Sequence, residues 1–195
     1  MTGPLGLAAR PLLTGGKADD VHAEVTIVPR GRALGVTQFS EEDRLNIPEH
    51  YIGARLSVAL GGRAAEELTL REVSSGAEND LEVATWFARR MVERWGMGEE
   101  LGPVSFPRDG ASPVGFGPTA SPGLGERADR EVIRILKDAE QAALRTLTEH
   151  RAALDALAEA LLERETVDKN EVDEIVVKAG DKPVRTAAAK EPAKA

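Results

Sequence analysis

The chain has 195 residues, 25 Lys and Arg against 33 Asp and Glu, a formal net charge of −8 and no Cys. The absence of Cys excludes a disulfide scaffold, a thiolate zinc site and a Cys nucleophile. A net acidic chain lacks the clustered positive charge that phosphate contacts require, so we expect no nucleic-acid partner. The 42% of hydrophobic residues suffices for a core in one domain.

The first part of the chain predicts an irregular segment followed by two short strands. Gly and Pro recur through residues 1–20 and oppose a continuous helix. Apolar residues then alternate along 21–28, which is typical of a strand. A turn at 29–32 leads to a second expected strand at 33–39, so a small hairpin or meander is predicted.

Helical spacing begins at Pro48 and continues to Leu70, with an expected interruption at Gly61 and Gly62, which fit either a helix C-cap or a close packing point. The segment 75–78 (SGAE) has the form of a capping box that opens a helix through Trp95. This spacing would place the carboxylate of Asp80 in the first turns of that helix, where the helix dipole favours it.

The second half predicts more helix. Residues 102–125 form a Pro- and Gly-rich loop, and apolar stripes along 126–162 indicate two antiparallel helices that meet near 149–151. The segment 167–171 (VDKNE) indicates a cap for a last helix through Val177. We therefore expect a mainly α fold with a small β-sheet near the N-terminus and a disordered tail at 178–195.

The residues alone identify no catalytic centre. The three His, at positions 22, 50 and 150, do not form His-Glu-x-x-His, the motif that puts two zinc ligands and a general base on one helix face. Glu66 fits a solvated helix face as well as a functional role. No phosphate-binding glycine loop is present, so the chain is not expected to bind ATP.

A resemblance to a known family adds to this interpretation. The sequence resembles the M41 peptidase domain of the FtsH family, ATP-dependent zinc metalloproteases anchored in membranes. The likeness is carried, in the family's order, by 21–37 (VHAEVTIVPRGRALGVT), 59–67 (ALGGRAAEE), 75–85 (SGAENDLEVAT), 88–92 (ARRMV), 95–103 (WGMGEELGP) and 165–168 (ETVD). It implies an M41 domain at 21–177, after an irregular degenerate segment at 1–20.

The resemblance also implies roles for particular residues. Asp80 falls on the family's third zinc ligand, and Glu66 falls on a Glu that orients the ligands without binding the metal itself. Gly35, Val36 and Thr37 match the edge strand along which a substrate peptide adds. For the family this implies zinc-dependent endopeptidase proteolysis of peptide substrates.

One departure sets this chain apart from the pattern. Family members carry His-Glu-x-x-His shortly before the position of His22, whereas this chain has PLGLA at 4–8, with Leu7 near the place of the second His. One Asp cannot hold catalytic zinc, so we expect no bound zinc and no activity from this chain alone. We also expect the family's first helix to be broken or missing, with apolar surface exposed unless residues 1–20 or a partner cover it.

Three functions remain open. The chain could be an inactive M41 domain that associates with itself or with intact FtsH-like subunits as an assembly or regulatory partner. It could be a truncated or wrongly started remnant of an active FtsH-like zinc protease. It could be a hydrolase that uses the carboxylates of Glu66 and Asp80. No membrane span or signal peptide is recognised, so a cytoplasmic location, with membrane association only through a partner, is expected.

Overall fold

A computed structural model describes residues 4–14, 21–28, 36–40, 46–106 and 122–180. These residues form a mainly helical fold with one small sheet, as predicted. The helices are α1 (Pro4–Thr14), α2 (Glu49–Leu70), α3 (Glu78–Glu93), α4 (Pro122–Glu149), α5 (Arg151–Arg164) and α6 (Lys169–Lys178), with a 3-10 turn, η1, at Ser75–Ala77. The strands are β1 (Val21–Thr26), β2 (Val36–Ser40) and β3 (Thr166–Asp168).

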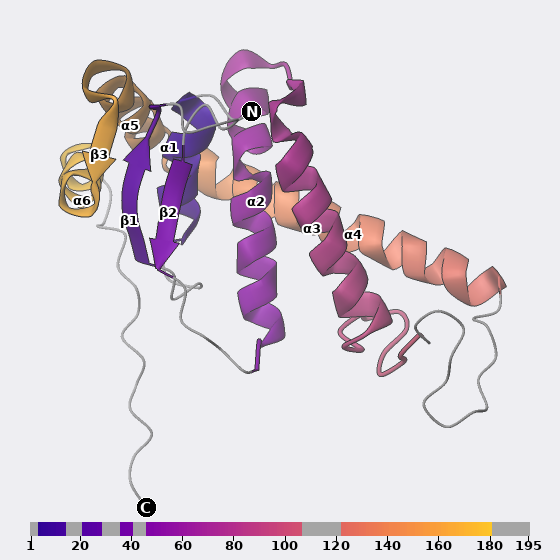
Figure 1. The fold of residues 1–195 in the computed structure, drawn as a ribbon. Helices are drawn as coiled ribbons and strands as arrows, with labels where there is room; N and C mark the ends of the chain where they lie inside the picture. The colour runs from indigo at the N-terminus through magenta and orange to yellow at the C-terminus, as the bar shows by residue number, and fades with distance from the viewer. Residues whose placement is uncertain (1–3, 15–20, 29–35, 41–45, 107–121, 181–195) are drawn as a thin grey trace, which may run out of the picture.

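The sheet has the order β2-β1-β3 and is antiparallel throughout. The two predicted strands are present as the antiparallel pair β1 and β2, and the predicted turn at 29–32 lies outside the described residues. A third strand that the sequence pattern did not predict joins the pair from far along the chain. Glu24 pairs with Asp168 and Val25 pairs with Val167. The sheet therefore links the beginning and the end of the described chain (Figure 1).

The prediction of an irregular segment at residues 1–20 is wrong for residues 4–14, which form α1. Pro4 occupies the first helical position, where the missing N–H costs nothing, and Pro11 removes one internal hydrogen bond. Burial outweighs this loss, because Leu7, Ala9 and Leu12 are at most 6% exposed in the largest core cluster. α1 therefore covers the apolar surface of its neighbours that would be exposed if this helix were missing.

The predicted interruption of the next helix at Gly61 and Gly62 is also wrong, because α2 is continuous over 22 residues. Gly61 is a close packing point between helices. A Cβ at this position would collide with the Cδ1 atom of Leu13 and lie 3.9 Å from the Cβ atom of Ala9. The missing side chain lets α1 approach the backbone of α2.

The core lies in one large cluster and two smaller ones. The large cluster joins α1, β1, β3, α5 and α6 with the ends of α2 and α4 that face them. The smaller clusters fill the contacts of α3 with α2 and α4, where the three helices pack together (Figure 1). The helices of the described segments include none with the length and apolar character that crossing a bilayer requires.

The helices predicted for the second half are present, although α4 begins at Pro122, within the segment predicted as a loop. The break between α4 and α5 lies at His150, within the predicted 149–151. Asp168 caps α6 in a complete capping box, in which its side chain accepts from the Asn170 and Glu171 amides and Glu171 accepts from the Asp168 amide. The tail expected to be disordered lies outside the described residues from 181 onward.

Candidate functional site

The N-terminus of α3 carries Asp80, and α1 brings a cation to it. The Nη2 atom of Arg10 lies 2.8 Å from Oδ1 and 2.8 Å from Oδ2 of Asp80. The two side chains are only 19% and 16% exposed, so the pair is partly shielded from solvent. Asp80 also lies in the first turn of α3, where the helix dipole stabilises its negative charge.

The turn before α3 is held by Glu66 of α2. Glu66 is 8% exposed, and its carboxylate accepts from the Ser74 amide and the Ser74 hydroxyl, both at 2.9 Å. Ser74 Oγ in turn accepts from the Gly76 amide at 3.1 Å and caps η1. The residues predicted to form a capping box from Ser75 to Glu78 do not do so, because η1 intervenes and Ser74 is the capping residue.

The expected substrate strand falls on β2. Gly35 lies outside the described residues, whereas Val36 pairs with Thr26 and Thr37 pairs with Val25. β2 is one of the two outer strands of the sheet, so within the described segments only one of its two edges is paired. An outer strand of this kind offers main-chain donors and acceptors to an added strand.

The histidines are spread over the fold. His22 lies in β1 opposite Phe39, His50 is exposed in the first turn of α2, and His150 separates α4 from α5. Across the described ranges, no three His, Asp or Glu side chains are gathered closely enough to share a metal ion.

Among the described residues, the groups around Asp80 do not make up a zinc ligand set. The face of α1 that reaches Asp80 presents a guanidinium, and Leu7 is buried in the core. Arginine offers no lone pair to a metal and repels it. Glu66 and Asp80 are hydrogen-bonded to different groups, Ser74 and Arg10, which does not favour the two carboxylates as an acid–base pair.

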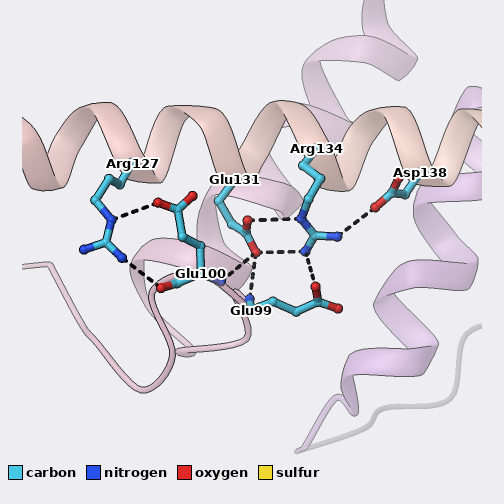
Figure 2. A network of polar contacts seen from close by, with 6 residues as sticks. All are labelled: Glu99, Glu100, Arg127, Glu131, Arg134 and Asp138. Atoms are coloured by element: carbon cyan, nitrogen blue, oxygen red, sulfur yellow. Dashed lines mark hydrogen bonds and ion pairs between the residues drawn. The ribbon is translucent and has the colours of Figure 1, made fainter.

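A second polar cluster, which sequence reasoning missed, is centred on Glu131 of α4 (Figure 2). Glu131 is 2% exposed, and its Oε1 atom accepts from the Glu99 amide at 2.7 Å and from Arg134 Nη2 at 2.8 Å. The loop after α3 approaches α4 closely, since a Cβ on Gly98 would lie 3.2 Å from Cγ of Glu131. The sequence signal was available, because Glu131 lies between Ala128 and Ile135 on the apolar stripe of the helix.

The charges of this cluster shift the pKa values of its members. The Arg134 guanidinium, and then the Glu99 amide, hold the pKa of Glu131 below its ordinary value against the opposing effect of burial. The same hydrogen bond raises the pKa of Arg134. Arg127 donates to the carboxylate of Glu100 and lowers its pKa. Each pKa shift shows that the neighbouring groups stabilise the charged form. These contacts hold the loop after α3 against α4.

Comparison with known proteins identifies the family of the chain. The sequence model of peptidase family M41 matches residues 13–175. An ATP-dependent zinc metalloprotease FtsH from Thermobaculum terrenum is 48% identical over 167 residues, which are 82% of this chain and 26% of that protein. An FtsH of the same description from Syntrophus aciditrophicus is 48% identical over 162 residues, 80% of this chain and 22% of that protein.

FtsH 4 of Sphaerobacter thermophilus is 46% identical over 177 residues, 87% of this chain and 26% of that protein. This chain belongs to peptidase family M41. It spans about a quarter of the length of these relatives. The family match begins at residue 13, so most of α1, including Arg10, precedes it.

Proposed function

We propose that this chain is an M41 domain that does not cleave peptides by itself and that acts as an assembly or regulatory partner of intact FtsH-like subunits. One observation carries the proposal. The guanidinium of Arg10 pairs with both carboxylate oxygens of Asp80, the residue that the resemblance implies as a zinc ligand. The chain also contains no His-Glu-x-x-His.

The chemical argument concerns what a peptidase of this class requires. Zinc activates water near neutral pH only when three protein ligands hold it and a fourth position stays open. Asp80 supplies one ligand, and the cation that faces it is a permanent one. We therefore expect neither zinc nor ATP to bind to this chain.

The parts of the domain that do not carry out chemistry are kept. Glu66 supports the turn that leads to Asp80, which agrees with its proposed role in positioning that carboxylate. The outer strand with Val36 and Thr37, with Gly35 before it, remains suited to an extended peptide. A chain of this kind can bind a peptide without cutting it.

The surface supports a role in association. Trp86 of α3 and Ile133 of α4 are each 52% exposed, and Val83 is 42% exposed. They lie on two helices that pack together, so we propose them as contact positions for another protein. The 48% identity to FtsH proteins makes a subunit of that kind the partner we propose.

A second candidate is that the sequence is a piece of an active FtsH-like zinc protease. It is favoured by the names of the relatives, of which this chain covers about a quarter. The DNA upstream of residue 1 decides between the two candidates. An in-frame His-Glu-x-x-His after an ATPase domain would support the second candidate and overturn the first.

The direct test is the zinc content of the purified and dialysed chain, with Asp80→Ala as the matched control. We expect both proteins to hold far less than one zinc per chain and neither to cleave casein with zinc added. Co-expression with an intact FtsH should give a complex that survives gel filtration. Stoichiometric zinc that is lost in Asp80→Ala would refute the inactive domain, and the absence of a complex would refute the partner role.

A further inference from the structure

We infer that the guanidinium of Arg10 is a built-in cation that replaces a metal ion as the cross-link between α1 and the N-terminus of α3. The inference rests on the proposal that this domain holds no catalytic zinc. It assigns to Arg10 a positioning and structural role that the family match, which begins at residue 13, does not include.

The geometry of the contact resembles ion chelation. Arginine commonly meets a carboxylate with two nitrogens, one for each oxygen. Here a single nitrogen, Nη2, lies at the same 2.8 Å from both oxygens of Asp80. The Arg151–Asp155 pair shares this geometry, with Nε at 2.9 Å from both oxygens, so what sets the Arg10–Asp80 pair apart is its lower exposure and the fact that it joins two helices instead of two turns of one.

The two helices that this contact joins pack mainly on other elements. α1 packs on α2 and α5, whereas α3 packs on α4 and α2. The Arg10–Asp80 pair joins residues 70 positions apart and bridges the large cluster around α1 and the smaller clusters around α3. Its loss should lower the stability of the fold without removing any apolar contact.

The position of Arg10 is fixed from behind. Ala9 and Leu13 flank Arg10 on α1 and lie against Gly61 of α2, so α1 has little freedom to slide or rotate. The packing of α1 therefore holds the guanidinium of Arg10 close to Asp80 whether or not a metal ion is present. A covalently attached cation cannot be removed by a chelator, and a second cation at Asp80 would be repelled by the first.

The test is a double-mutant cycle in urea unfolding, performed in EDTA. It compares Arg10→Met, Asp80→Asn and the double variant with the wild-type chain. Each single variant removes an ion pair that is partly shielded from solvent, so it should lower the folding equilibrium constant about ten- to a hundredfold. The double variant should lose no more than the worse single variant, because both charges are then gone.

The control is Arg151→Met, which removes an ion pair with Asp155 that is 43% and 46% exposed and a 3.5 Å hydrogen bond to the Leu68 carbonyl. It should lower the folding constant less than about fivefold. The inference is overturned if Arg10→Met resembles Arg151→Met, or if the two single losses simply add. Should Arg10→Met fail to fold, Arg10→Lys, which keeps the charge, must lose less than Asp80→Asn, and the reverse order refutes the role of the charge.

Zinc titration of the wild-type chain forms a separate arm that tests the proposed function. We expect the melting temperature to be the same in EDTA and in zinc. A rise with zinc in the wild-type chain that is absent in Asp80→Asn would refute the zinc-free domain. The coupling measured in EDTA would in that case still report whether Arg10 and Asp80 form a cross-link.

Discussion

Glu131 provides the sharpest test of how polar groups hold this fold together, and the informative change is Glu131→Gln. The substitution preserves the shape of the side chain but removes its charge. The carboxylate accepts two bonds from Arg134, at 3.1 Å and 2.8 Å, and one from the Glu99 amide. A hydrogen bond to a charged group contributes about 1.5–3 kcal/mol.

The glutamine can still accept from the Glu99 amide, but its NH₂ group would face the donors of Arg134. Because Arg134 is 40% exposed, water can take over part of its solvation. We therefore expect a loss of about 2–3 kcal/mol in the free energy of unfolding, which corresponds to a fall in Tm of about 4–12 °C for a chain of this size. Asp138→Asn, which removes a 58% exposed partner of the same Arg134, should cost less than about 1 kcal/mol.

The effect should depend on pH with a defined sign. The pKa of Glu131 in the folded chain lies below its ordinary value of 4.5. Its contribution is thus complete above pH 4.5 and is lost as the pH falls through the folded pKa. Urea unfolding at pH 7, 5 and 3.5 should show the deficit of Glu131→Gln shrinking only at the lowest pH. An equal deficit at all three values, or none at pH 7, would refute the reasoning.

Two further changes test the packing of the first helix. Leu7→Ala should lower the free energy of unfolding by about 2–5 kcal/mol in urea melts, because Leu7 is 2% exposed in the largest cluster, and a loss below about 1 kcal/mol would contradict its place in the core. A Cβ at Gly53 would meet nothing within 4 Å, so Gly53→Ala should stabilise α2 by about 0.5–1 kcal/mol. Gly61→Ala should lack this gain because its Cβ displaces Leu13. Equal Tm values for these two variants would contradict the close approach of α1.

Two local signals predicted local structure correctly, whereas the capping box expected at 75–78 was not formed. The capping box from Asp168 to Glu171 and the break at His150 depend on residues within a few positions, and both were found as predicted. Gly61 misled the prediction because the position of a glycine in the sequence does not show which neighbour comes close to it. The reason for this glycine is α1, which packs against α2 from the other end of the domain.

The sequence predicted the two acidic residues of the candidate site but not the partner of Asp80. Motif likeness placed Asp80 and Glu66, and the structure surrounds each with specific partners. The partner of Asp80 could not be predicted, because Arg10 is 70 residues away on a segment whose Pro and Gly argued against any helix. Burial of that segment overrides its weak propensity, and tertiary packing of this kind is not encoded in local spacing.

The pairing of β1 with β3 has a consequence for the order in which the chain can fold. Thr26 bonds the Thr166 hydroxyl across 140 residues, so β1 cannot acquire its second neighbour until almost the whole domain has left the ribosome. At about 5–20 residues per second, that wait is roughly 7–30 s. During synthesis the first strand has only β2 beside it, and its other edge is open to any extended segment nearby, including one from a second nascent chain.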